Sequence, residues 1–157
     1  MIFDFNIREA NLIDIPQLMS IRLSVHENQL SDPALVPHED YLDFITNRGK
    51  GWVAEIEGKI VGFAIVDLRE NNILALFMDP NFEKKGIGKE LHDLMIQWYF
   101  EQTKTTVWLG TEANSRAAHF YLKSGWTEVG LHGKNEIKFE MTCDNWNSRI
   151  SNRTLCP

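Results

Sequence analysis

The sequence lacks several features that define whole classes of protein. No apolar run approaches the roughly 20 residues that span a bilayer, so we expect neither a transmembrane helix nor a membrane partner. The first residues, MIFDFN, have no basic segment before a long apolar stretch, so no signal peptide is expected. The sequence has only two cysteines, Cys143 and Cys156, and we expect reduced thiols and a cytoplasmic protein.

Excess positive charge and metal-binding patterns are also absent. The chain has 16 Lys and Arg residues against 22 Asp and Glu residues, and its net charge of −6 argues against nucleic acid as a partner. The five histidines do not have the spacing of metal ligands, so no metal is expected. Neither cysteine lies in a pattern that would activate a nucleophile, which argues against a covalent intermediate.

The length and composition are those of one globular domain. A chain of 157 residues is large enough to bury a core and falls within the usual range for a single domain. Hydrophobic residues make up 43% and charged residues 24%, both ordinary values. Residues 143–157 are rich in Asn and have few apolar side chains. We therefore predict one domain over residues 1–142 and a C-terminal tail over residues 143–157.

Hydrophobic periodicity and turn residues predict the order β-α-α-β-β-β-α-β-α-β-β. Asp14 and Pro16 mark the start of the first helix, and Gly49 and Gly51 mark the end of the second. The predicted segments are a strand at 5–8, helices at 14–25 and 39–46, a hairpin at 52–56 and 60–66, a strand at 73–79, a helix at 90–99, a strand at 105–109, a helix at 114–123, and strands at 126–131 and 137–142.

The segment between the strand at 73–79 and the next helix carries the strongest functional signal. It contains Gly86 and Gly88, and Lys84, Lys85 and Lys89 add positive charge. The backbone N–H groups at a helix start lack partners in the helix, the helix dipole favours negative charge, and glycine lets a ligand approach the backbone. This segment therefore predicts a site for a phosphate or pyrophosphate.

Two well-known phosphate-binding loops do not fit this segment. A P-loop would need glycine at Glu83 and a hydroxyl residue at Glu90. The dinucleotide fingerprint would need glycine at Leu91.

The chain resembles the GNAT superfamily of acetyl-CoA-dependent N-acetyltransferases. One family block matches Met78-Asp79-Pro80 followed by Glu83-Lys84-Lys85-Gly86-Ile87-Gly88, with Glu83 where the family usually has Gln or Arg. A second block matches Asn114, Tyr121 seven residues later, and the pair Gly125-Trp126. The resemblance covers residues 5–142. It implies an α/β (α+β) fold whose mixed, mostly antiparallel central sheet of about seven strands is flanked by about four helices.

The resemblance also implies which residues hold acetyl-CoA, as a co-substrate and without a metal. Backbone groups of the strand would bind the pantetheine arm, and backbone N–H groups of the turn would bind the pyrophosphate. Asn114 would contact the cofactor arm, besides serving as a helix cap. The implied cofactor-binding residues are Leu76, Phe77, Met78, Lys84, Lys85, Gly86, Ile87, Gly88, Lys89 and Asn114.

Tyr121 is the residue that the resemblance assigns to proton transfer. A phenol with an ordinary pKa of about 10 can protonate a departing CoA thiolate, whose thiol has a pKa of about 8.5. A core role for this ring is the alternative. The general base stays open between Glu112, Glu27 and a water chain, because the position where some family members have Glu is Gly110. Glu27 and Asn28 fall where the family lines the acceptor site.

The sequence thus predicts an N-acetyltransferase that acts by direct attack of a primary amine in a ternary complex. The acceptor is left open between a small amine, an aminoglycoside-like compound or polyamine, an amino acid and a peptide or protein amine. A homodimer is left open too. One alternative is a non-catalytic acyl-CoA-binding or sensing domain, which Glu83 and the missing base suggest. Another is an interaction protein that binds no acetyl-CoA.

Overall fold

A computed structural model describes residues 4–30, 36–83 and 86–149. The chain divides into two compact units, Met1–Ile96 and Gln97–Pro157, and each is described by itself. The described residues form seven strands and five α-helices, and the α/β class is confirmed. The order of elements follows the predicted one, with an additional helix after the last strand.

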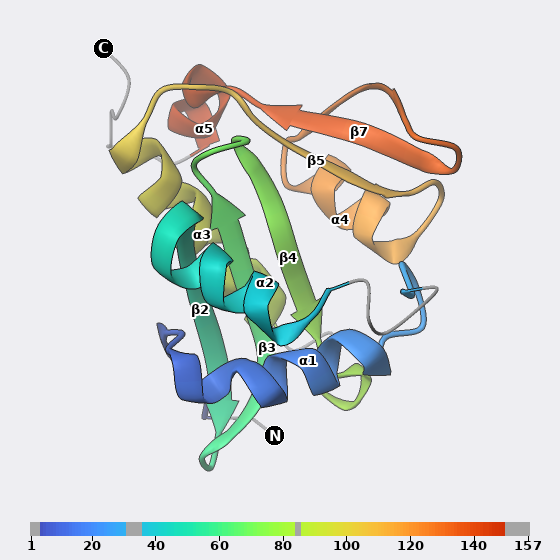
Figure 1. The fold of residues 1–157 in the computed structure, drawn as a ribbon. Coiled ribbons are helices and arrows are strands. Elements are labelled where there is room, and N and C mark those ends of the chain that lie inside the picture. The colour runs from blue at the N-terminus through green and yellow to red at the C-terminus, as the bar shows by residue number, and fades with distance from the viewer. Residues whose placement is uncertain (1–3, 31–35, 84–85, 150–157) are drawn as a thin grey trace. The chain divides into compact units, whose positions relative to one another are not determined.

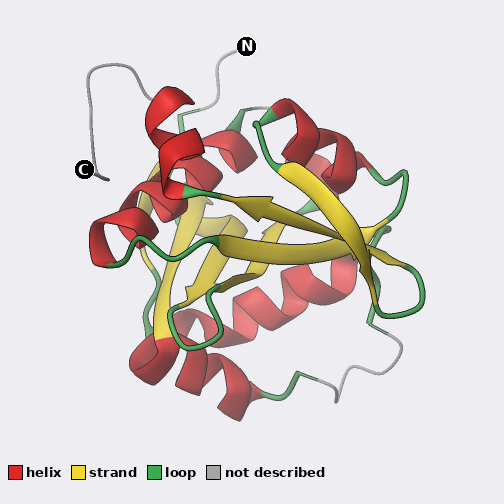
Figure 2. Ribbon diagram, turned by 90° about the horizontal axis from the view of Figure 1, so that it is seen from above, coloured by secondary structure: helices red, strands yellow, loops and turns green. Residues whose placement is uncertain are grey.

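The first unit is an antiparallel sheet covered by helices (Figure 1). Its strands run in the order β1 (Asn6–Glu9), β2 (Gly49–Ile56), β3 (Lys59–Asp67) and β4 (Asn72–Met78). Helices α1 (Ile15–Ser24) and α2 (His38–Asp43) cover one face of this sheet, and α3 (Ile87–Gln102) begins on the other face (Figure 2). The sheet therefore has a helical layer on both faces.

The core of this unit lies between α1, α2 and the sheet. Helix α1 buries Ile15, Leu18 and Ile21, which recur every three residues and so face the same side of the helix. They pack with Tyr41 of α2 and Phe63 of β3. The packing of these apolar side chains holds α1 and α2 against the strands.

The second helix ends at Gly49, as the sequence predicts. A π-helical segment, Phe44–Arg48, continues α2 up to Gly49, and Gly49 also opens β2. A Cβ atom at Gly49 would lie 1.8 Å from the carbonyl oxygen of Val66 on the paired strand. Gly49 is therefore needed for the close approach of β2 and β3.

The second unit is an antiparallel sheet in the order β5 (Val107–Glu112), β7 (Glu136–Met141) and β6 (Thr127–His132). Helix α4 (Arg116–Lys123) lies between β5 and β6 in the chain, and α5 (Cys143–Arg149) follows β7. Helix α5 occupies the start of the segment that the sequence assigns to a tail. Its Trp146 is buried and donates from Nε1 to Oε1 of Gln97 over 3.1 Å. Cys143 is disulfide-bonded, so the expectation of a reduced thiol is wrong there.

Candidate active site

A short turn leads from β4 to α3. Asp79 caps a 3₁₀ helix, Pro80–Phe82, by accepting a hydrogen bond from the backbone N–H of Asn81 over 2.9 Å. The N–H of Phe82 donates to the carbonyl of Asp79 over 2.9 Å. The predicted site residues Lys84 and Lys85 lie outside the described residues.

Helix α3 begins with backbone donors that have no partner within the helix. The carbonyl of Gly86 accepts from the N–H of Glu90 over 3.2 Å, so the helical hydrogen bonds start there. The N–H groups of Ile87, Gly88 and Lys89 precede that bond and lack a helical acceptor. Gly86 has a φ of +80°, which favours glycine, and it turns the chain into the helix. The site thus offers donors and the positive end of a helix dipole to an anion.

Among the described residues, little crowds the position beside Gly88. A Cβ atom built there would meet Met78 Cγ at 3.8 Å, an ordinary contact, and no closer heavy atom among the described residues. The Lys89 ammonium group is already paired with Asp93 Oδ2 at 2.6 Å. At this helix start the backbone therefore offers an anion more direct contacts than the lysine side chain does.

Strand β4 directs alternate backbone groups to its two sides. Asp79 donates to the carbonyl of Val61 on the paired strand over 2.8 Å, and Phe77 lies opposite Phe63 in the same register. Because antiparallel pairs alternate between hydrogen-bonded and non-hydrogen-bonded positions, Phe77 also directs its N–H and C=O toward β3. Leu76 and Met78 direct theirs away from β3. Of the three strand residues predicted to bind the pantetheine arm, Leu76 and Met78 therefore present backbone N–H and C=O groups on the side away from β3.

Around Tyr121, α4 ends in a turn that fixes the Gly-Trp pair. The N–H of Trp126 donates to the carbonyl of Tyr121 over 3.0 Å, and the N–H of Gly125 donates to that of Leu122 over 3.1 Å. Gly125 has a φ of +95°, as this helix ending requires. The family block at these residues therefore includes a helix terminus that sets the Tyr121 side chain relative to Trp126.

Tyr121 is buried among aromatic side chains. Its ring lies 5.4 Å from that of Trp126 and 6.2 Å from that of Phe139, centroid to centroid. Burial raises the pKa of the Tyr121 hydroxyl above its ordinary value. The phenol is therefore kept protonated through the neutral range, as a proton donor requires.

The start of α4 differs from the prediction at one residue. The expectation that Asn114 caps the helix is wrong, because the cap is Ser115. Its Oγ accepts from the N–H of Ala118 over 3.1 Å and donates to the carbonyl of Glu112 over 2.8 Å. Asn114 precedes it with a φ of +60° and makes the turn out of β5. Asn favours this left-handed conformation more than most residues do.

The predicted acceptor residues follow the end of α1. The helix ends at Ser24, so Glu27 and Asn28 lie in the loop beyond it. Asn28 has a φ of +55°, and Gln29 donates from Nε2 to the carbonyl of Val25 over 3.3 Å. The left-handed conformation of Asn28 and this hydrogen bond give the loop a defined turn. The other candidate base, Glu112, is the last residue of β5.

One charged residue of the first unit, Arg22, is missing from the sequence prediction. Arg22 lies four residues after the buried Leu18, so it falls on the apolar side of α1. Its guanidinium carbon lies 4.3 Å from the centroid of the Phe77 ring. A charged residue in an apolar helical stripe is the signal that could have found it.

Within the described ranges, no group of three or more Asp, Glu, His or Cys side chains is placed to hold a metal ion. No helix in that part of the chain is both long and apolar enough to cross a membrane.

Comparison with known proteins agrees with this geometry. The model of the acetyltransferase (GNAT) family matches residues 15–126, which include α1, the β4–α3 turn and the Gly-Trp pair. The chain belongs to the GNAT family. The match is consistent with the helix start, which suits a phosphate-bearing acyl donor.

Sequence identity to individual relatives is low. The chain is 33% identical over 84 residues to an N-acetylaspartate synthetase of Danio rerio, covering 50% of this chain and 30% of that protein. It thus spans about a third of the length of the synthetases it matches. It is 26% identical over 123 residues to the ribosomal protein bS18 alanine N-acetyltransferase of Escherichia coli K12, covering 75% and 78% of the two chains.

A solved structure shows the same fold. The PaiA N-acetyltransferase of Thermoplasma acidophilum, in complex with coenzyme A, superposes with a TM-score of 0.76 at 16% identity. The match covers 89% of this chain and 99% of that one. It confirms the fold that the sequence resemblance implies.

Proposed function

We propose that the chain transfers the acetyl group of acetyl-CoA to a primary amine by direct attack in a ternary complex. The observation that carries this proposal is the start of α3, where three backbone N–H groups lack helical acceptors and where, among the described residues, a Cβ atom at Gly88 would meet only Met78 Cγ at 3.8 Å. Family membership supports an acetyl donor, and a structural relative holds coenzyme A. The names of the relatives refer to different acceptors, aspartate and a ribosomal protein alanine.

In this proposal the first unit binds the donor. The N–H groups of Ile87, Gly88 and Lys89 accommodate the pyrophosphate, since they have the dipole and the access that an anion needs. The backbone groups of Leu76 and Met78 bind the pantetheine arm, because they point away from β3. Phe77 contributes its ring beside them rather than its backbone.

The chemistry requires two proton transfers. The neutral amine attacks the thioester carbonyl, a C–N bond forms, and the amine nitrogen loses a proton to a base. The tetrahedral intermediate then collapses, the C–S bond breaks, and the CoA thiolate receives a proton. Tyr121 supplies that second proton, since burial keeps its hydroxyl protonated. Glu112, Glu27 and a water chain remain the candidate bases.

A non-catalytic acyl-CoA-binding domain is the alternative that the comparisons do not favour, since the named relatives are acetyltransferases. The cytoplasmic location stays a prediction, and the disulfide-bonded Cys143 is the observation that bears against it.

The proposed function is tested with purified protein, acetyl-CoA and a panel of amines. Release of the CoA thiol that depends on both the amine and the protein would support it. Tight acetyl-CoA binding without thiol release for any amine would instead favour the non-catalytic domain. Absence of acetyl-CoA binding would overturn both.

Glu27 gives a prediction about the acceptor. Its carboxylate would attract a cationic amine or take its proton, so Glu27→Gln should lower kcat/KM for the best acceptor by about 10-fold or more. The affinity for acetyl-CoA should stay unchanged. Glu101→Gln, an exposed change in the last turn of α3, serves as the control. Equal kcat/KM for Glu27→Gln and wild type would remove Glu27 from the site.

A further inference from the structure

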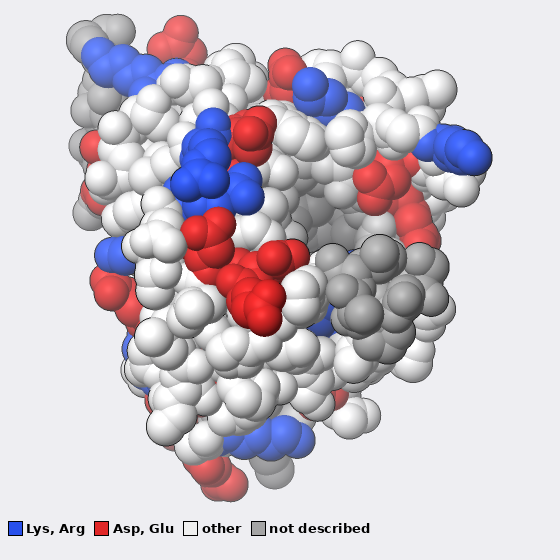
Figure 3. Space-filling model, in the orientation of Figure 1, with Lys and Arg blue, Asp and Glu red and all other residues white. Residues whose placement is uncertain are grey.

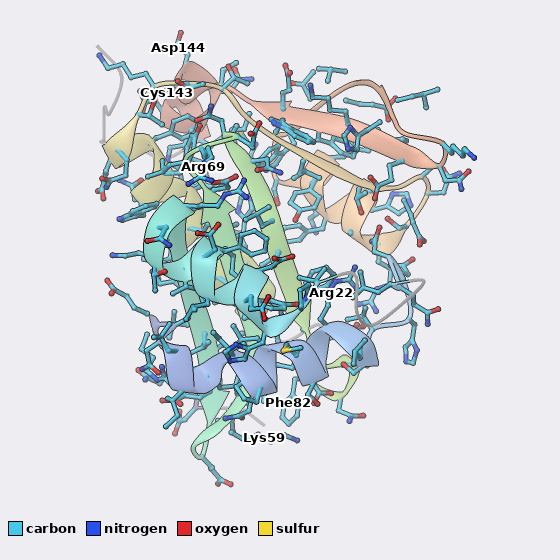
Figure 4. The ribbon with its side chains drawn as sticks, in the orientation of Figure 1. Arg22, Lys59, Arg69, Phe82, Cys143 and Asp144 are labelled. Atoms are coloured by element: carbon cyan, nitrogen blue, oxygen red, sulfur yellow. The ribbon has the colours of Figure 1, made fainter. Side chains whose placement is uncertain are left out.

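Arg22 is a partly buried cation of the first unit whose Nη1 atom is buried. Helix α1 places it one turn after Leu18, on the side that packs against the sheet. Its guanidinium carbon lies 4.3 Å above the Phe77 ring, which in turn lies 5.8 Å from the Phe63 ring, centroid to centroid. Figure 4 shows Arg22 between α1 and the end of β4. The charge is thus held at the inner edge of an apolar cluster.

No carboxylate within the described residues neutralises this charge. Arg22 Nη1 is buried and has no hydrogen-bond partner there. Burial lowers the pKa of Arg22, and the ionisable side chain that acts on it is the Tyr41 phenol. Two other arginines of this unit differ, since Arg8 is paired with Asp14 and Arg48 with Asp67. Among the described residues, Arg22 Nη1 is therefore a desolvated donor without an acceptor.

Such a group costs stability unless something else satisfies it. A buried donor without a partner has lost its hydrogen bonds to water and gained none in return. The ring of Phe77 compensates in part, because its face attracts a cation. The Phe77 ring does not, however, accept hydrogen bonds from the N–H groups that lie in the plane of the guanidinium. The planar fork of an arginine is suited to binding a carboxylate through two parallel hydrogen bonds.

The location of Arg22 connects it to the transfer site. Phe77 lies between Leu76 and Met78, whose backbone groups we assign to the pantetheine arm, and successive Cα atoms are about 3.8 Å apart. An acceptor held at Arg22 would therefore lie close to the donor's thioester end. We propose that the acceptor carries a carboxylate next to its primary amine, as an amino acid does, and that Arg22 binds this carboxylate. The inference rests on the proposed function.

The charge on the surrounding surface fits an amino acid better than a simple anion. Acidic side chains gather over α2, where Glu39 and Asp40 form its first turn (Figure 3). They would repel a molecule with net negative charge but not a zwitterion, whose ammonium group they attract. A polyamine could use the acidic side chains but would meet an unfavourable charge at Arg22. Among the acceptors left open by the sequence, the amino acid is the one that matches both charges.

The test compares amines that differ only in the carboxylate. α-Amino acids and their carboxamides are assayed in pairs for CoA thiol release, at equal concentrations of the free amine, together with a polyamine. We expect kcat/KM for the amino acid to exceed that for its amide by about 10-fold or more, since a site built for a polar group rejects analogues that lack it. Amides or polyamines that react as well as amino acids would overturn the inference while leaving the proposed function intact. Thiol release from no amine at all would overturn the proposed function.

Substitution of Arg22 separates binding from a purely structural role. Arg22→Gln should raise KM for the amino acid by about 10- to 100-fold, with the rate for the amide and the affinity for acetyl-CoA unchanged. Arg22→Lys should recover part of the loss, because it restores the charge but not the fork. Arg69→Gln, at an exposed arginine of the β3–β4 turn, is the matched control.

Stability gives a second measurement. If Arg22 serves ligand binding, Arg22→Met should keep or raise Tm, because it removes a partly buried charge and retains an apolar stem over Phe77. A lower Tm with equal losses for amino acid and amide would show that Arg22 supports the fold, and would overturn the proposal.

Discussion

Tyr121→Phe should lower the rate of acetyl transfer by about 10²- to 10⁴-fold, the usual contribution of a positioned proton donor. The substitution removes one hydroxyl and keeps the ring that packs against Trp126 and Phe139. Thermal stability and the affinity for acetyl-CoA should therefore change little. The rate is best measured in a single turnover, since slow product release can hide a chemical step in kcat.

A second buried tyrosine provides the control for this experiment. Tyr99 of α3 is fully buried, and Tyr99→Phe makes the same chemical change outside the predicted site. It should leave the single-turnover rate near the wild-type value. If Tyr121→Phe also keeps the wild-type rate, Tyr121 is a core residue and the thiolate leaves without its help.

The pH dependence follows from the burial of Tyr121. A general acid acts only while protonated, so its contribution is lost as the pH rises through its pKa. Burial raises the pKa of Tyr121, which moves that loss above the ordinary value of about 10. The wild-type rate should therefore show no fall assignable to Tyr121 below about pH 10.

The β4–α3 junction could be predicted because its signal is local. The apolar strand, Pro80, the two glycines and the amphipathic helix follow one another, and each residue acts mainly on its neighbours. The boundaries of β4 and α3 therefore agree with the sequence prediction within a few residues. The Gly-Trp pair after α4 is another such case, since Gly125 is needed for the helix ending.

Other features depend on choices that the sequence leaves open. Asn114 and Ser115 are both good helix caps, and the choice of Ser115 depends on where β5 ends, because its hydroxyl binds the carbonyl of Glu112. Gly49 ends the helix as predicted, but its need for close strand contact was not predicted, because that need arises only once β2 pairs with β3.

Arg22 and α5 were missed for a related reason. The position of Arg22 over Phe77 joins residues 55 positions apart in the chain, and no local pattern encodes such a contact. The segment that forms α5 has a polar composition, yet it buries Cys143 and Trp146. One disulfide-bonded Cys and one buried Trp that donates to Gln97 tie α5 to the unit, but they hardly change the composition of a 15-residue stretch.

Gly88→Val should weaken acetyl-CoA binding by about 10- to 100-fold, which corresponds to losing one or two charge-assisted hydrogen bonds. The added side chain would enter the space beside the N–H groups that we assign to the pyrophosphate. The fold should tolerate it, because a Cβ atom at this position meets only Met78 Cγ at 3.8 Å among the described residues. Valine also has a slightly higher helix propensity than glycine, so Tm should not fall.

The affinity for acetyl-CoA, measured by calorimetry on folded protein, is the readout for this substitution. Gly88→Ala should give a smaller loss than Gly88→Val, since its methyl group occupies less of the same space. Glu101→Val places the same β-branched residue in the last turn of α3, at an exposed position far along the helix, and should leave the affinity unchanged. Gly86 is a poorer choice, because its φ of +80° would add backbone strain to any steric effect. If folded Gly88→Val binds acetyl-CoA as tightly as wild type does, the pyrophosphate lies elsewhere, and the assignment of the start of α3 to the donor is wrong.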